Sequence, residues 1–73
     1  MKIEIDKEAD AAYIYFKEIK AGEVSETISL NKNINVDLDK EGKTLGIEIL
    51  DVSKQIPKDF LQSVKVKNIQ LEN

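Results

Sequence analysis

The stretch of the chain with the most potential for chemistry is acidic. Asp37, Asp39, Gly42 and Glu48 match four positions of the calcium-binding EF-hand loop, with Glu41 where Asp or Asn is usual. An EF-hand loop needs a helix on each side, whereas apolar and polar residues alternate with period two on both sides of Gly42. Strands would carry Glu48 along the return strand, away from Asp37. We therefore interpret the centre of this stretch as a type I turn with Gly42 in the left-handed region, and metal binding through acidic turns is the alternative.

A second acidic cluster consists of Asp6, Glu8 and Asp10. Asp side chains accept hydrogen bonds from the backbone two residues on, and they tolerate the left-handed conformation. We interpret this cluster as a turn, with a cation or substrate site as the alternative.

The candidate partner surface is aromatic. In an expected strand over residues 11–17, alternation places Phe16 on one side and Tyr13 and Tyr15 on the other. The two tyrosines are either structural or lie under a protein partner, because tyrosine combines a large apolar body with a polar tip and is enriched at interfaces. Gly46 interrupts the return strand of the main hairpin, and we expect Tyr13 or Tyr15 to pack over it.

The residue types present argue against catalysis. The chain has no His and no Cys, which removes the usual nucleophile and base pairs and the usual ligands of zinc. It also has no glycine-rich phosphate loop. The sequence therefore predicts that the protein is not an enzyme and has no catalytic residues, no metal site and no cofactor; a small enzyme using paired carboxylates is the remaining alternative.

Charge and hydropathy restrict the partners and the location. The net charge is −3, and all eleven basic residues are Lys, so no basic, arginine-rich surface for nucleic acid is expected. There is no apolar run of about 18 residues, and the first residues lack the apolar core of a signal peptide. We expect a cytoplasmic protein that does not enter a membrane.

The short chain predicts one domain over residues 1–73 with a thin core. A domain of this size buries only about 60% of its unfolded surface, and the chain has no Cys to form a disulfide. Open sheet edges and a thin core favour self-association, so we favour a homodimer over a monomer.

Period-two alternation predicts a mainly β (α+β) fold, an antiparallel β-meander of about five strands. Strands are expected at residues 2–6, 11–17, 23–30, 34–38 and 45–50. A short C-terminal helix should begin at Pro57 and pack on one face of the sheet, whereas residues 64–71 could be helix, strand or tail. The expected core comprises Ile3, Ile5, Ile14, Phe16, Ile28, Leu30, Ile34, Val36, Leu38, Leu45, Ile47, Ile49, Phe60, Leu61 and Val64.

Two stretches resemble the signature of a small prokaryotic family, domain of unknown function 2283. They are DKEADAAYI at residues 6–14 and VDLDKEGKTLGIEILD at residues 36–51, and the resemblance covers about residues 1–54. Lys7 stands where the family commonly has proline. The family has no established activity, so the resemblance supplies no catalytic residues. Some relatives are encoded beside small toxin-like proteins, so the resemblance implies an antitoxin-like role. From the residues themselves we expect a non-catalytic protein–protein interaction module that presents Tyr13 and Tyr15 to a partner.

Overall fold

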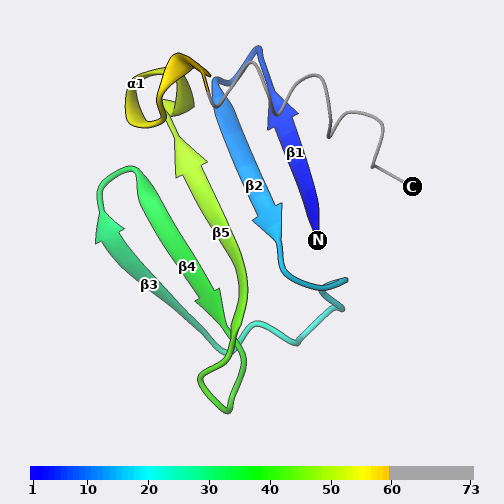
Figure 1. Cartoon of the computed structure of the whole chain (residues 1–73). Helices are drawn as coiled ribbons and strands as arrows, with labels where there is room; N and C mark the ends of the chain where they lie inside the picture. Colours follow the sequence, from blue (N-terminus) through cyan, green and yellow to red (C-terminus); the bar gives the residue numbers. More distant parts are fainter. Residues whose placement is uncertain (60–73) are drawn as a thin grey trace.

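The computed structural model describes residues 1–59 of the chain. They form one antiparallel sheet followed by a short helix (Figure 1). The strands are β1 (Lys2–Asp6), β2 (Ala11–Tyr15), β3 (Glu26–Asn31), β4 (Ile34–Leu38) and β5 (Thr44–Leu50), and the helix is α1 (Val52–Gln55). The expected five-stranded antiparallel sheet with a short helix is confirmed.

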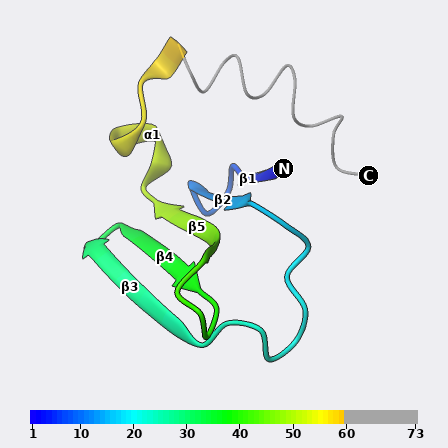
Figure 2. The same cartoon turned by 60° about the horizontal axis from the view of Figure 1, so that its bottom comes forward.

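The spatial order of the strands is β1-β2-β5-β4-β3. Strands β3, β4 and β5 follow one another as a meander, and the β1–β2 hairpin joins them because β2 pairs with β5. The connection over residues 16–25 runs from the end of β2 to the far edge of the sheet, where β3 begins (Figures 1 and 2). β5 is therefore the central strand, and β1 and β3 are the two edges.

The sheet has one apolar face because alternate apolar residues of all five strands are in register. Side chains of register partners in a sheet point to the same face. A row of β-branched residues crosses the whole sheet in this way, and β-branched side chains pack well on a pleated surface. The row consists of Ile3, Ile14, Ile47, Val36 and Ile28, each paired with the next.

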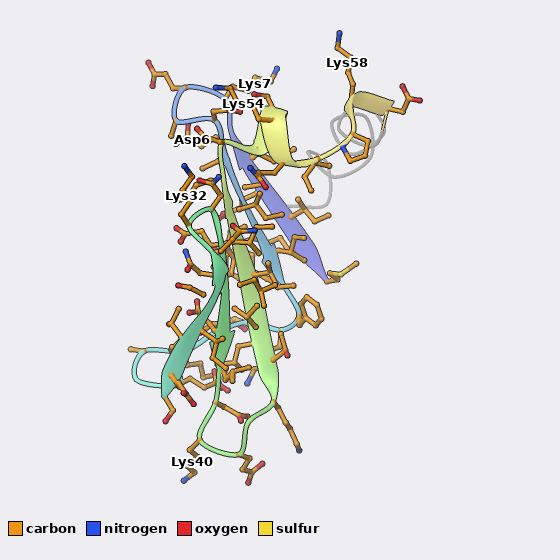
Figure 3. The ribbon with its side chains drawn as sticks, turned by 90° about the vertical axis from the view of Figure 1, so that its left-hand side faces the viewer. Asp6, Lys7, Lys32, Lys40, Lys54 and Lys58 are labelled. Carbon is orange, nitrogen blue, oxygen red and sulfur yellow. The ribbon has the colours of Figure 1, made fainter. Side chains whose placement is uncertain are left out.

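Helix α1 covers only one end of this apolar face. Figure 3, which views the sheet close to edge-on, shows α1 standing off one side of it. Val52 of α1 is buried in a cluster with Ala12 and Ile49, against which Ile56 also packs. Among residues 1–59, the buried apolar side chains are those of Ala12, Leu45, Ile49 and Val52.

Three residues of the expected core are exposed. Phe16 is 49% exposed, Ile28 42% and Leu30 66%. Phe16 follows the end of β2, and the other two lie on the edge strand β3, so none has neighbours on all sides. The expectation of burial is therefore wrong for these residues, whereas Phe60, Leu61 and Val64 lie outside the described residues.

Several element boundaries also differ, apart from shifts of one residue at the end of β3 and at the start of β5. The second strand ends at Tyr15, two residues early, and the third begins at Glu26 because Glu23 is held in a turn. The Glu23 backbone N–H donates to the Lys20 carbonyl (3.0 Å), and its carboxylate accepts from the Lys20 N–H (2.9 Å). Helix α1 precedes Pro57 and was not predicted, because residues 51–56 have no apolar period. Of the helix expected from Pro57, Lys58 and Asp59 are helical, and the remainder lies outside the described residues.

Asp10 joins the β1–β2 turn to α1. Its φ of 53° is left-handed, its carbonyl accepts from the Val52 N–H (2.9 Å), and its carboxylate accepts from the N–H (3.1 Å) and hydroxyl (2.7 Å) of Ser53. These bonds position α1 over the sheet. The second acidic cluster thus includes a structural turn residue, as the turn interpretation predicts.

Replacing Asp10 with Ala should lower the free energy of unfolding by about 2 kcal/mol. The change removes both side-chain hydrogen bonds to Ser53 and puts a residue without turn preference in the left-handed region. Asp10→Asn is the matched control, because it tolerates the same backbone and keeps an acceptor oxygen. Urea denaturation measures the difference, and equal midpoints for Asp10→Ala and the native chain would contradict this role.

Candidate functional site

The face of the sheet opposite α1 is polar. The register places on it the residues that alternate with the apolar rows, and we call this surface the polar face. It comprises Lys2, Glu4, Asp6, Ala11, Tyr13, Tyr15, Thr27, Ser29, Asn35, Asp37, Gly46, Glu48 and Leu50. Both tyrosines of the candidate partner surface thus lie on the same face, together with four carboxylates.

The Tyr13 side chain lies across Gly46 of the neighbouring strand. A Cβ atom added at Gly46 would stand 2.5 Å from the Tyr13 hydroxyl oxygen and 2.7 Å from its Cζ atom. The expectation that an aromatic side chain packs over Gly46 is confirmed, and the residue is Tyr13. Its hydroxyl donates to Asp37 Oδ2 at 2.6 Å, so β4 holds a side chain that originates on β2.

Tyr15 is held from the other side, by β1. Its hydroxyl donates to Glu4 Oε1 at 2.8 Å, and the Lys2 ammonium lies 4.9 Å from the centre of its ring. Lys2 also forms an ion pair with Glu4 at 3.6 Å. The Tyr13 and Tyr15 rings pack at a centroid distance of 4.6 Å with an interplanar angle of 52°. The two rings therefore form one aromatic unit with a carboxylate at each end.

Asp37 continues the network towards the β3 edge. Its Oδ1 atom accepts from the Thr27 hydroxyl at 2.6 Å, while Oδ2 is occupied by Tyr13. A second line of bonds runs beside it: Ser29 donates to Asn35 (2.6 Å), and Asn35 donates to Glu48 (3.1 Å). Side chains of β2, β5, β4 and β3 are thereby linked across the polar face.

Sequence reasoning did not identify Asp37 as the partner of Tyr13, and it did not identify Thr27 and Asn35 as members of the network. Alternation alone assigns a face within each strand, but it does not say which strands are neighbours. Gly46 of β5 is the register partner of Tyr15 on β2 and of Asp37 on β4. Tyr13 is two residues from Tyr15 on the same face, and its side chain reaches across Gly46 to Asp37. The glycine itself was the signal that an aromatic side chain would pass there.

Burial, the hydrogen bond to Asp37 and the negative charge of Asp37 raise the pKa of Tyr13 well above its usual value. Because the native pKa exceeds the unfolded one, the contribution of Tyr13 to the free energy of unfolding is complete below about pH 10 and declines as the pH rises from there.

We expect the free energy of unfolding to fall between about pH 9 and about pH 11 more steeply for the native chain than for Tyr13→Phe. The Phe variant lacks the titrating hydroxyl of Tyr13 and is otherwise the same chain, so it is the control for every other effect of high pH. Urea denaturation at the two pH values gives both slopes, and parallel slopes would show that Tyr13 ionises as freely in the native state as in the unfolded one.

The acidic stretch that resembles an EF-hand loop forms a hairpin turn. Asp39 Oδ1 accepts from the N–H groups of Glu41 and Lys43 at 2.9 Å each, and Gly42 has a φ of 86°. The predicted turn with a left-handed Gly42 is confirmed. The backbone hydrogen bond from Lys43, followed by that from Glu41, lowers the pKa of Asp39.

The other carboxylates of this stretch are held apart by the strands. Asp37 bonds to Tyr13 and Thr27, whereas Glu48 bonds to Asn35. Within residues 1–59, no three side chains of His, Cys, Asp or Glu are grouped in a way that could hold a metal ion. No observation favours the metal-binding alternative over a structural role for these carboxylates.

No helix within residues 1–59 has the length and apolar character that crossing a bilayer requires.

Comparison with known proteins identifies a family. Neither the curated proteins nor the solved structures include a match to the chain. A family model, described as protein of unknown function (DUF2283), matches residues 2–53, which contain the whole sheet. The chain therefore belongs to the DUF2283 family of proteins of unknown function.

Proposed function

We propose that the chain is a non-catalytic protein–protein interaction module that binds a protein with a basic surface through Tyr13 and Tyr15. The observation that supports this most is the fixed position of both rings. Each hydroxyl is tied to a carboxylate, and the rings pack against each other. Side chains that are already ordered lose little conformational entropy on binding, and tyrosine contributes strongly to interfaces.

The charge of the sheet fits a basic partner. Residues 1–50 carry seven Lys and eleven Asp or Glu. The strands carry four carboxylates on the polar face against the single ammonium of Lys2; they belong to Glu4, Asp6, Asp37 and Glu48. A carboxylate has about four acceptor sites, so Glu4 and Asp37 can still accept from Lys or Arg of a partner while they hold the tyrosines. Complementary potential speeds association, which suits an antitoxin-like protein that covers a basic target.

The same groups are unsuited to acid–base chemistry. Because its pKa is raised, the Tyr13 hydroxyl stays protonated at neutral pH and is a weak acid. The sequence also offers no His or Cys that a tyrosine or carboxylate could work with. The tyrosines and carboxylates of the polar face are therefore better suited to binding than to catalysis.

Tyr15→Ala tests the proposal. The chain is co-expressed with the product of the adjacent gene, the complex is purified, and the dissociation constant is measured for each variant. If Tyr15 is a central interface residue, its truncation should raise the dissociation constant about 30-fold or more, corresponding to a loss of about 2 kcal/mol. Binding should also weaken as salt is raised, because opposite charges steer it.

Phe16→Ala is the matched control. Phe16 follows Tyr15 directly at the end of β2, carries a ring of similar size and is 49% exposed. Continued alternation would place it on the apolar side of the strand. Melting temperatures of both variants show whether the sheet is intact. If Phe16→Ala abolishes binding while Tyr15→Ala leaves it unchanged, the partner binds the apolar face and the proposal is wrong.

A further inference from the structure

The two edges of the sheet differ in how they are protected. Charged residues on an edge strand discourage pairing with another chain. Edge β1 carries Lys2, Glu4 and Asp6 among its five residues. Edge β3 carries a single charge, Glu26, among six residues, all of them exposed. An antiparallel edge of this kind is a template for a further strand.

The backbone of β3 has groups that point away from the sheet. The Leu38 carbonyl accepts from the Ser25 N–H (2.8 Å), so Leu38 directs its backbone towards β3. Its register partner is Glu26, and alternate residues of an antiparallel strand direct their backbone groups to opposite sides. Thr27 and Ser29 therefore present their N–H and C=O groups at the outer edge.

The side chains on this edge include exposed apolar ones. Ile28 is 42% exposed and Leu30 66%, and both lie on the apolar face of the sheet or at its margin. The register shift between Ser29 and Asn31 is at the end of the strand and leaves Glu26 to Ser29 regular. An added strand would cover Ile28 and extend the apolar face.

We propose that β3 pairs antiparallel with β3 of a second copy, about a two-fold axis at Ile28. In this register Ile28 lies opposite the partner's Ile28, and Thr27 lies opposite the partner's Ser29. Thr27 and the partner's Ser29 exchange both backbone hydrogen bonds, and symmetry repeats the exchange on the other side of the axis. The two sheets become one continuous sheet.

The charges at this edge are complementary to themselves. Glu26 begins β3 and Lys32 follows its last residue, so antiparallel pairing brings the Glu26 end of one strand to the Lys32 end of the other. Opposite charges therefore lie near each other at each end of the new strand pair, where two long side chains can meet. The two Glu26 side chains are about 14 Å apart along the strands, beyond the screening length at physiological salt.

This surface is separate from the one in the proposed function. The order β1-β2-β5-β4-β3 places β3 three strands away from β2, which carries Tyr13 and Tyr15. A pairing of two β3 strands leaves both tyrosines accessible. The inference therefore does not depend on the proposed function, and either can fail alone.

Cysteine cross-linking tests the register, because the chain has no cysteine of its own. Ile28→Cys places two thiols opposite each other across the axis, at a separation that a disulfide can span after mild oxidation. Leu30→Cys is the matched control: it is on the same strand and more exposed, but its copies lie about 14 Å apart. We expect Ile28→Cys to form a disulfide-linked dimer at least tenfold faster than Leu30→Cys.

Sedimentation equilibrium on the unmodified chain gives a second readout. We expect a concentration-dependent shift from the 8.3 kDa monomer to a dimer of twice that mass. Glu26→Lys should weaken the dimer roughly fivefold, and adding Lys32→Glu should restore it. A chain that stays monomeric at every concentration, or equal cross-linking at positions 28 and 30, would overturn the pairing.

Discussion

Gly46→Ala is expected to lower the free energy of unfolding by about 3 kcal/mol. A Cβ atom at this position would overlap the Tyr13 ring, 2.5 Å from its hydroxyl oxygen and 2.7 Å from Cζ. The ring must move away, which costs about 1–3 kcal/mol in strained packing and breaks the hydrogen bond to Asp37, worth about 1 kcal/mol. Urea denaturation followed by circular dichroism measures the loss.

A double-mutant cycle identifies the cause. In a Tyr13→Ala background the ring is absent, so Gly46→Ala should be neutral or stabilise by up to about 1 kcal/mol, because alanine loses less entropy than glycine in a strand. The coupling energy between the two positions is then about 3 kcal/mol. Gly22→Ala is the control: its φ of 81° makes alanine unfavourable, but no atom lies near its Cβ position. The effect of Gly22→Ala should be the same in both backgrounds, and an equal effect of Gly46→Ala in both would mean that Tyr13 is not the obstacle.

The strands and their faces were predictable because each depends on neighbours in the sequence. Period-two alternation identified β1 and β4 to the residue, and Asp39 with Gly42 identified the turn between β4 and β5. The position of Tyr13 or Tyr15 over Gly46 was also predictable, since a glycine within a strand leaves room that an aromatic neighbour fills.

Contacts between distant segments were not predictable from the pattern. Asp10 meets Ser53 only because β2 and β5 are neighbours, and no local feature of either residue encodes that pairing. Helix α1 has four residues, too few to show an apolar period, so Val52 was missed as a core residue. Ile28 has the alternation of a core residue and is nevertheless exposed, because alternation assigns a face but not whether anything covers it.

The two faces of the sheet account for different properties of the protein. Side chains on the polar face are hydrogen-bonded to one another, which fixes their positions but buries little apolar surface. Stability must therefore come largely from the apolar face, and within residues 1–59 a cluster of three buried residues lies under α1. A typical domain of 73 residues has about 4–11 kcal/mol of stability in total.

Ile49→Ala should consequently be the most damaging single truncation in the cluster under α1. Ile49 is 6% exposed, is paired with Ala12 on one side and Ile34 on the other, and packs in the cluster with Val52. Removing its side-chain carbons leaves a cavity at the centre of the cluster, which costs about 2–5 kcal/mol, a large share of the total.

Leu50→Ala is the matched control for this prediction. It removes the same number of carbon atoms from the adjacent residue of the same strand, but on the opposite face, where Leu50 is 36% exposed. We expect it to cost about 1 kcal/mol or less, because truncation of a partly exposed side chain creates little internal cavity. Urea midpoints of the two variants therefore compare the two faces directly. If Leu50→Ala destabilises the chain as much as Ile49→Ala, the stability does not depend on the cluster under α1, and residues on the polar face contribute to the core.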